Sequence, residues 1–339
     1  MGAVPELHTY IIAEIGVNHN GSVDLAKQLI NEAKECDADA VKFQTFRAES
    51  LVSPNTLKVA YQRETTSEAE SHYEMIRKLE LGYKEHEILF DYCRKSNIDF
   101  ISTPYDIKSA KFLNELGVST YKTASADIVD LPLHEYLAAT NKNVIIATGM
   151  ATLGEVDEAL SLYEDKTNIA LLHCVSNYPC SKESLNLRAM TTLKNTFNVQ
   201  VGFSDHSIGP HAASLAVALG ASIVERHFTL DKTLPGPDHK ASSTPAEFRD
   251  YINYIRAAET ALGSSRKQCQ EEEAQMASVS RKSIVLRHGL KEGHVMTKDD
   301  LTLKRPGTGL YAREMKNILN RRVRTDLAKD HILSYFDLE

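Results

Sequence analysis

Short apolar stretches alternate with amphipathic ones eight times before about residue 263. The apolar stretches predict strands at 10–16, 39–46, 98–105, 120–127, 143–150, 169–176, 201–207 and 222–228. The segments between them carry apolar residues at helical spacing, as Val23, Ala26, Leu29, Ile30 and Ala33 do after the first strand. Eight strand–helix units predict a closed (βα)8 TIM barrel, in which the loops after the strands build the active site.

Two segments depart from this alternation. Residues 47–80, rich in Glu, Ser and Thr, predict a loop and an extra helix beside the barrel mouth, where they could shape a pocket. Residues 280–339 carry short alternating stretches broken by glycine, which predicts a small β-rich domain. We therefore expect a barrel domain at 1–263, a polar linker at 264–279 and a C-terminal domain at 280–339.

The charge is unevenly distributed. The chain has 339 residues and a net charge of -7, yet residues 280–339 hold 13 Lys or Arg against 8 Asp or Glu. This basic tail is either solvated surface or a module that covers an anionic ligand or an acidic neighbour. Its basic residues are scattered and have few aromatic neighbours, which argues against a nucleic-acid partner.

The cysteines and the hydropathy pattern bear on the compartment. Five cysteines, without a CxxC pair, argue against a disulfide framework and a structural zinc site, so we expect reduced thiols. No run of about 18 apolar residues occurs, and the first ten residues lack a basic and then apolar leader. We therefore expect a cytoplasmic protein with no membrane partner.

Lysines at two strand exits indicate an anionic ligand. Lys42 and Gln44 share one strand face, and Lys122 ends another strand. Two such lysines favour a highly charged anion such as a phosphate ester. Hydroxyls at successive exits could complete its site: Ser102, Thr103, Thr123, Ser125, Thr148, Ser176 and Ser204. Under strict alternation Lys122 would face away from Ser125, so a joint role requires a bulge or an early strand end.

A carboxylate and two histidines complete the candidate chemistry. Glu14 lies in an otherwise apolar strand, where it is either a catalytic group or half of a salt bridge. His206 and His227 end neighbouring predicted strands, each with a carboxylate nearby in sequence (Asp205 and Glu225), which predicts a shared divalent cation. Imidazole suits Zn, Mn, Fe or Co. We interpret His173 and Cys174, inside an apolar strand, as core residues.

The motifs in their order resemble the sialic acid synthase family, which includes legionaminic and pseudaminic acid synthases. They are IIAEIGVNHNGSVDLAK, VKFQTF, STPYD, YKTASAD, ATGM, LLHCVSNYP, GFSDHSIG, ERHFTLD and PGPDH, with KRPGTGL marking a C-terminal antifreeze-like (SAF) domain. The resemblance covers nearly the whole chain. It implies condensation of phosphoenolpyruvate with open-chain N-acetylmannosamine and water, giving N-acetylneuraminate and phosphate with C–O cleavage. The alternatives are a legionaminic acid synthase, which would use 2,4-diacetamido-2,4,6-trideoxymannose, and a pseudaminic acid synthase.

The same resemblance implies roles for individual residues. Phosphoenolpyruvate would contact a set of lysines and hydroxyls: Lys42, Thr103, Lys122, Ser125 and Ser204. His206 and His227 would hold the metal, with Mn2+ expected and Mg2+ or Co2+ as alternatives, and Glu14 would be the catalytic acid and base. The acylamino sugar would contact the remaining motif residues: Gln44, Asp127, Tyr178, Asp238 and, from the SAF domain, Arg305.

Departures from the family pattern affect the phosphate and sugar contacts. Ala147 stands where some members have serine and Ser176 where some have asparagine, so part of the phosphate contact would fall to Thr148 or Asn177. Asp127 stands where several members have glutamate.

The resemblance also implies how chains associate. It predicts a domain-swapped homodimer in which Arg305 of one chain lies over the pocket of the other. A tail folded over its own barrel is the alternative. Two other classes of protein also stay open: a Schiff-base aldolase with Lys122 or Lys42 as nucleophile, and a non-catalytic sugar-binding protein.

Overall fold

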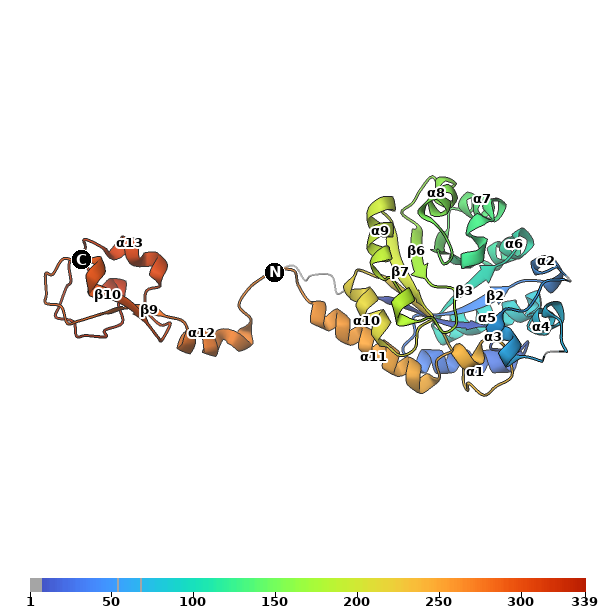
Figure 1. Cartoon of the computed structure of the whole chain (residues 1–339), viewed down its shortest axis with the longest axis horizontal. Helices are drawn as coiled ribbons and strands as arrows, with labels where there is room; N and C mark the ends of the chain where they lie inside the picture. The colour runs from blue at the N-terminus through green and yellow to red at the C-terminus, as the bar shows by residue number, and fades with distance from the viewer. Residues whose placement is uncertain (1–7, 54, 68) are drawn as a thin grey trace. The chain divides into compact units, whose positions relative to one another are not determined.

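The computed structural model describes residues 8–53, 55–67 and 69–339. The chain divides into two compact units, the first ending at Gly263 and the second running from Ser264 to Glu339 (Figure 1). Each unit has its own cluster of buried apolar side chains. Within the described residues, no helix is long and apolar enough to cross a membrane.

The first unit is a closed barrel of eight parallel strands, as predicted (Figure 1). The strands are β1 Tyr10–Gly16, β2 Ala40–Thr45, β3 Asp99–Pro104, β4 Thr120–Thr123, β5 Asn143–Ala147, β6 Ile169–Cys174, β7 Gln200–Asp205 and β8 Ile223–His227. Strand β1 pairs with both β2 and β8, which closes the ring. β4 is shorter than predicted, because the 3₁₀ helix η1 Ser125–Val129 follows it almost at once.

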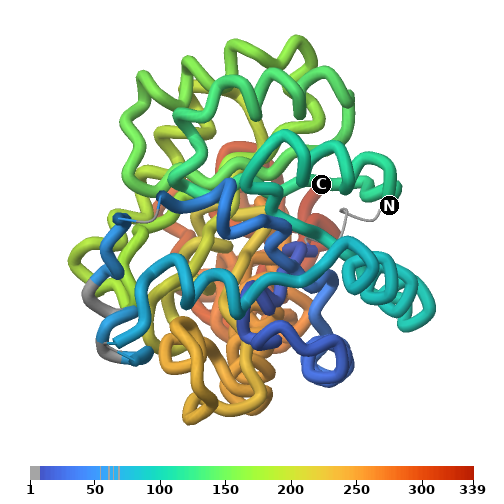
Figure 2. The backbone as a smooth tube through the Cα atoms, turned by 90° about the vertical axis from the view of Figure 1, so that its right-hand side faces the viewer, coloured from blue at the N-terminus to red at the C-terminus, as the bar shows by residue number. Residues whose placement is uncertain are grey.

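Helices follow the strands around the barrel. They are α1 Val23–Glu35, α5 Tyr83–Ser96, α6 Ile107–Leu116, α7 Leu131–Ala139, α8 Leu153–Ser161, α9 Arg188–Phe197, α10 His211–Ala218 and α11 Pro245–Leu262. Figure 2 shows the backbone from a second side, with the green middle part of the chain at the top and an orange part at the bottom. Ser22 caps the first helix after a turn at Asn20 and Gly21, because its side chain accepts a hydrogen bond from the backbone N–H of Leu25.

The predicted insertion between β2 and β3 contains three short helices before α5. They are α2 Ala48–Leu51, α3 Ala60–Thr65 and α4 His72–Lys78. Ser71 caps α4 and forms a reciprocal pair with Glu74, in which each satisfies a backbone N–H of the other. The carbonyl of Pro237, in the loop after β8, accepts a hydrogen bond from Thr65. The insertion and the β8 loop therefore meet beside the barrel mouth.

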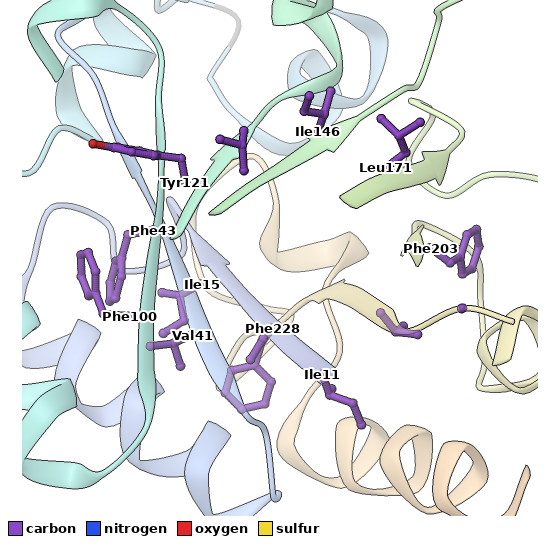
Figure 3. Packing of buried hydrophobic residues seen from close by; sticks show 14 of the residues in the cluster. Ile11, Ile15, Val41, Phe43, Phe100, Tyr121, Ile146, Leu171, Phe203 and Phe228 are labelled. Carbon is purple, nitrogen blue, oxygen red and sulfur yellow. The ribbon is translucent and has the colours of Figure 1, made fainter. Parts of the chain in front are cut away.

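Strand alternation separates two apolar layers. Side chains such as Ile11, Ile15, Val41 and Phe43 form the outer layer, which packs against the helices (Figure 3). Inward-facing residues form a second, smaller cluster inside the barrel: Ile12, Ala40, Ile101, Ile145, Ala170, Leu172 and Ile223. Two residues further along their strands, Glu14 and Lys42 continue the inward face. The barrel interior therefore has an apolar floor with charged side chains above it.

The second unit has less regular structure than predicted. Its strands β9 Ser283–Leu286 and β10 Leu301–Lys304 form a two-stranded antiparallel sheet, supplemented by isolated bridges. Helix α13 Met315–Ile318 lies in the same unit, and the predicted linker contains η4 Glu271–Glu273 and most of α12 Ala274–Ser280. Leu290 and Leu327 exchange both backbone hydrogen bonds. Buried side chains including Ile284, Leu286, Met296 and Leu333 give this small unit an apolar core of its own.

Candidate active site

The carboxyl ends of the barrel strands surround a cavity of about 290 Å³. Most of the residues predicted for the site line it: Glu14, Lys42, Gln44, Thr103, Lys122, Ser125, Tyr178, Ser204, His206, His227 and Asp238. The early end of β4 lets Lys122 and Ser125 line the same cavity, which answers the geometric requirement for their joint role. The structure thus brings eleven of the thirteen predicted residues together around one space.

Glu14 lies against Lys42 and Gln44. Lys42 Nζ is 2.5 Å from Glu14 Oε2, and Gln44 Nε2 donates to Glu14 Oε1 at 2.9 Å. Burial raises the pKa of Glu14 to about 7, although Lys42 opposes the change. Gly16 makes room for this carboxylate, since a Cβ there would lie 2.6 Å from Glu14 Oε1. The salt bridge, one of the two interpretations of Glu14, is therefore present, and a pKa of about 7 is compatible with the other, a catalytic group.

Glu225 lies between the two lysines. Its Oε1 is 3.9 Å from Lys42 Nζ, and its Oε2 is 3.8 Å from Lys122 Nζ. Burial by itself raises the pKa of Glu225, but Lys122 and Lys42 more than offset this and lower it overall. Burial lowers the pKa of Lys122 despite Glu225. From the sequence, Glu225 is expected only as a carboxylate near His227, although its spacing two residues before His227 places both on one strand face.

His206 and His227 face each other at the exits of β7 and β8, with ring centroids 5.7 Å apart. His206 Nδ1 donates to the carbonyl of Val175 at 2.7 Å, which leaves its Nε2 unprotonated when the ring is neutral. Among the described residues, His227 Nδ1 has no hydrogen-bond partner. Burial lowers the pKa of both imidazoles, so both are neutral near pH 7. The ring of Tyr178 packs on His206 at 4.0 Å between centroids.

The two carboxylates that lie near these histidines in the sequence contact other groups in the structure. Asp205 faces the opposite side of β7 and binds the guanidinium of Arg226 at 3.0 Å. Glu225 hydrogen bonds with Ser204 and approaches the lysines. A backbone carbonyl instead orients His206, and the nearest carboxylate oxygen to His227 belongs to Asp238, at 3.9 Å. Asp205 and Glu225, which are near the histidines in sequence, are therefore not the groups that orient the two rings.

The two histidines fit a metal ion as a partial ligand set. Neutral imidazoles with an available ring nitrogen are the form that binds divalent cations. No group of three or more His, Cys, Asp or Glu side chains within the described residues is arranged to hold an ion. A metal here would therefore have two protein ligands and take its other ligands from water or substrate.

Groups at or just beyond the ends of β4, β5 and β6 contact one another at the cavity wall. Ser125 Oγ accepts from the backbone N–H of Gly149 at 3.0 Å and lies 3.0 Å from Cys174 Sγ. A Cβ at Gly149 would lie 2.4 Å from Ser176 Oγ and 2.7 Å from Cys174 Sγ, so this position accepts only glycine without rearrangement. Cys174 is buried, as expected of a core residue, and it also lines the cavity. His173 bonds the carbonyl of Leu185 through Nε2, away from the cavity lining.

The expected substitutes for the phosphate contact are otherwise engaged. Thr148 Oγ1 donates to the carbonyl of Leu172, and Asn177 Nδ2 donates to the carbonyl of Pro179. Neither residue lines the cavity, whereas Ser176 does. The cavity lining therefore favours Ser176 over Thr148 and Asn177 for a phosphate contact, and the contact itself stays a prediction.

Two residues predicted to contact the sugar are not among those that line the cavity. Asp127 sits in η1, outside the cavity lining, and burial raises its pKa to about 6. Arg305 belongs to the second unit, where it is exposed just after β10. Three residues of the insertion and three that follow β1, β2 and β3 form an apolar part of the cavity lining: Leu51, Ile76, Leu79, Val17, Phe46 and Tyr105. We refer to these six residues as the apolar wall.

Comparison with known proteins identifies the family. Residues 29–267 match the NeuB family, and residues 281–339 match the SAF domain. The first match spans well over half of the sequence. This chain belongs to the NeuB family. The resemblance inferred from its motifs is thereby confirmed, and the second unit carries the SAF domain of this NeuB-family chain.

Relatives of this NeuB-family chain are named as synthases. It is 42% identical over 329 residues to the N,N'-diacetyllegionaminic acid synthase of Campylobacter jejuni, covering 96% of this chain and 98% of the relative. It is 42% identical over 336 residues to the enzyme of that name from Legionella pneumophila, covering 97% and 94%. A crystal structure of the N-acetylneuraminic acid synthetase of Leptospira borgpetersenii, in complex with citrate, aligns with a TM-score of 0.72 at 35% identity, over 81% of this chain and 93% of that one. The chain is therefore an enzyme of the NeuB type.

Proposed function

We propose that this enzyme condenses phosphoenolpyruvate with the open-chain aldehyde of an acylamino sugar, giving a nonulosonic acid and phosphate. One observation carries the proposal. Two buried lysines and two buried carboxylates line a small cavity at a barrel mouth, beside two neutral histidines. The lysines suit a small polyanionic substrate, and a buried carboxylate can transfer protons during its reaction.

The negative charges of phosphoenolpyruvate complement the positive charges of the two lysines. Lys42 and Lys122 are 4% and 2% exposed. Their ammonium groups therefore lie in a largely water-free environment, where the attraction between opposite charges is stronger than in water. Thr103 on β3 and Ser204 on β7 add hydroxyls to the cavity lining, and Lys42 Nζ already donates to Thr103 Oγ1 at 3.2 Å. In our proposal the phosphoryl group lies toward Lys122 and Ser125, and Glu225 keeps the lysines protonated.

Glu14 is our candidate for the proton transfers. Carbon 3 of the enol attacks the aldehyde carbon, and positive charge develops at carbon 2. Water adds at carbon 2 and loses a proton to a base, after which the C–O bond breaks and phosphate leaves. A carboxyl with a pKa of about 7 can accept the proton of water and return one to an oxygen. His206 and His227 would hold a divalent cation, Mn2+ as first choice, which when bound would polarise the aldehyde.

The apolar wall favours a deoxy sugar. A methyl group at carbon 6 would gain from contact with Phe46 and Leu79, whereas a hydroxymethyl group there would lose hydrogen bonds to water. Burial of one methyl-sized group is worth about 0.8 kcal/mol. With the relatives at 42% identity, this favours 2,4-diacetamido-2,4,6-trideoxymannose, the sugar of a legionaminic acid synthase. We therefore place it ahead of N-acetylmannosamine, the first expectation from the sequence.

N-acetylmannosamine stays the second candidate. The similarity to a sialic acid synthetase supports it, and Gln44, Tyr178 and Asp238 offer polar groups suited to a polyhydroxylated sugar.

We propose further that the enzyme acts as a domain-swapped homodimer, with Arg305 of one chain over the cavity of the other. Its planar fork of donors suits the carbonyl of an acyl group.

Phosphate release tests the proposal. The enzyme is incubated with phosphoenolpyruvate and each of three sugars: the trideoxy sugar, N-acetylmannosamine and its 6-phosphate. We expect phosphate release that depends on sugar, with kcat/KM for the trideoxy sugar more than about tenfold higher, or about 1.4 kcal/mol. The opposite ratio would reassign the sugar. Absence of phosphate release with every sugar, together with trapping of substrate on Lys122 by borohydride, would instead indicate a Schiff-base aldolase.

A further inference from the structure

The hydroxyl of Ser125 has two neighbours besides the cavity. The N–H of Gly149 donates to its oxygen, and Cys174 Sγ lies 3.0 Å from the same oxygen. A hydroxyl oxygen has two lone pairs and one proton. The Gly149 bond takes one lone pair, so the thiol interacts either with the second lone pair or with the proton.

An anion in the cavity decides between these two arrangements. A phosphoryl group offers only acceptors at this wall, so the Ser125 proton must turn toward it to make a bond. The thiol of Cys174 can both donate and accept, although weakly. With the cavity free of anions it can accept the Ser125 proton, and with an anion bound it can donate S–H to the second lone pair. The sulfur therefore remains a partner of Ser125 in both states.

We propose that Cys174 is a positioning residue that fixes the Ser125 hydroxyl as a donor to the phosphoryl group of phosphoenolpyruvate. The inference rests on the proposed function and deepens it. Three observations support it: Cys174 Sγ is close to Ser125 Oγ, Cys174 lines the cavity that Lys122 also lines, and Gly149 has no side chain that could separate Ser125 from Cys174. Cys174 itself need not contact the substrate.

The location of Cys174 distinguishes it from the other buried cysteine nearby. Cys180 is buried to a similar degree, 6% exposed against 5%, but packs in the apolar cluster outside the barrel strands and does not line the cavity. Removal of either thiol leaves a small void of similar size. Cys180→Ala is therefore a matched control for the loss of a buried sulfur.

Steady-state kinetics separate positioning from structure. Cys174→Ala should raise KM for phosphoenolpyruvate by about three- to tenfold, the value of one hydrogen bond, and leave KM for the sugar unchanged. Cys174→Ser keeps a group that donates and accepts, so its KM should lie between those of wild type and Cys174→Ala. Cys180→Ala should leave KM for phosphoenolpyruvate as it is. Thermal melts of all variants show whether each is folded.

A double mutant tests whether Cys174 acts through Ser125. Once Ser125→Ala has removed the hydroxyl, adding Cys174→Ala should change KM for phosphoenolpyruvate by less than about twofold, because nothing remains to be oriented. If the two effects multiply, Cys174 acts by another route and the inference is overturned. A Cys174→Ala enzyme with wild-type KM for phosphoenolpyruvate overturns it as well.

Binding of inorganic phosphate separates this inference from the proposed reaction. Calorimetric titration of the full chain needs no turnover, and we expect Cys174→Ala to weaken phosphate binding by the same factor as it raises KM. Weaker binding in an enzyme that shows no synthase activity would retain the inference and reject the proposed reaction. Equal phosphate binding by wild type and Cys174→Ala, or no phosphate binding by wild type, would reject the inference.

Discussion

Glu14 and Lys42 form a buried ion pair across neighbouring strands, with 2.5 Å between Oε2 and Nζ. The two residues are register partners of β1 and β2, so the backbone itself holds them side by side. Burial alone would lower the pKa of Lys42, but Glu14 and Glu225 reverse this and raise it. The lysine therefore stays charged while the carboxyl, with a pKa of about 7, exchanges its proton.

Replacement of Glu14 should abolish most turnover. Glu14→Gln keeps the shape and the contact with Gln44 but removes the ionisable group, so kcat should fall by about 10²- to 10⁴-fold. In wild type the base form of Glu14 grows as the pH rises through about 7, so kcat should rise there. A pH profile of kcat for both proteins checks this. A Glu14→Gln enzyme that keeps the same rise near pH 7 would assign the base to another residue.

Removal of divalent metal should stop the reaction, because two neutral imidazoles face one space at the strand exits. Exhaustive chelation should abolish phosphate release, and Mn2+, Mg2+ or Co2+ should restore it. His206→Ala combined with His227→Ala should lose both the activity and its metal response. Full activity of that double variant after chelation would contradict a metal-dependent mechanism.

Isotope labelling reports which bond breaks. With oxygen-18 in the bridging position of phosphoenolpyruvate, attack of water at carbon 2 should send the label into phosphate. Mass spectrometry of both products checks this. Label retained in the keto acid would mean that water attacks phosphorus.

Mixed dimers test whether the SAF domain acts on the partner barrel. One chain carries Glu14→Gln with Arg305 intact, and the other carries Arg305→Ala with Glu14 intact. If Arg305 acts in trans, each mixed dimer holds one complete site, and activity should approach half that of wild type per dimer. If it acts in cis, no site has both residues and mixing restores nothing. The measurement is phosphate release after unfolding and refolding the mixture together.

Acid should weaken the second unit through Asp300. Burial alone would raise its pKa, but hydrogen bonds from His294 and Thr297 lower it from 3.8 to about 2. A lowered carboxyl pKa stabilises the fold above the unfolded value, and this stabilisation is lost as the pH falls from about 4 to 2. Asp300→Asn should cost about 1–2 kcal/mol at pH 7. Hydrogen exchange of peptides from 283–304 should show this difference shrink at low pH.

Strand alternation explains most of what could be predicted from the sequence. The apolar stretches located all eight strands, and the period of two placed Glu14, Lys42 and Ser204 on the inward face. The same rule, applied more strictly, turns Asp205 away from His206, since adjacent residues of a strand face opposite sides. Nearness in sequence to His206 therefore does not bring Asp205 to the cavity lining.

The other differences arise where the strand period no longer holds or where several strands converge. Asp127 lies in a 3₁₀ helix, so counting from Lys122 by twos could not place it. The position of Glu225 between Lys42 and Lys122 depends on side chains from three strands, and no local pattern specifies that distance. Cys174 is buried as its apolar strand predicts, but its place in the cavity lining depends on where β6 ends, which the apolar pattern does not specify.

Gly16 sets a limit on redesign of this enzyme. Its φ is 51°, and a Cβ at this position would lie 2.6 Å from Glu14 Oε1, so any side chain there would displace the carboxylate. Substitution of Gly16 is therefore not a route to accepting new aldehyde substrates. Leu51 and Ile76 belong to the apolar wall, and substitutions at these two positions could reshape it while Glu14 and Lys42 stay in place. A library aimed at new acylamino sugars should vary the insertion and leave β1 unchanged.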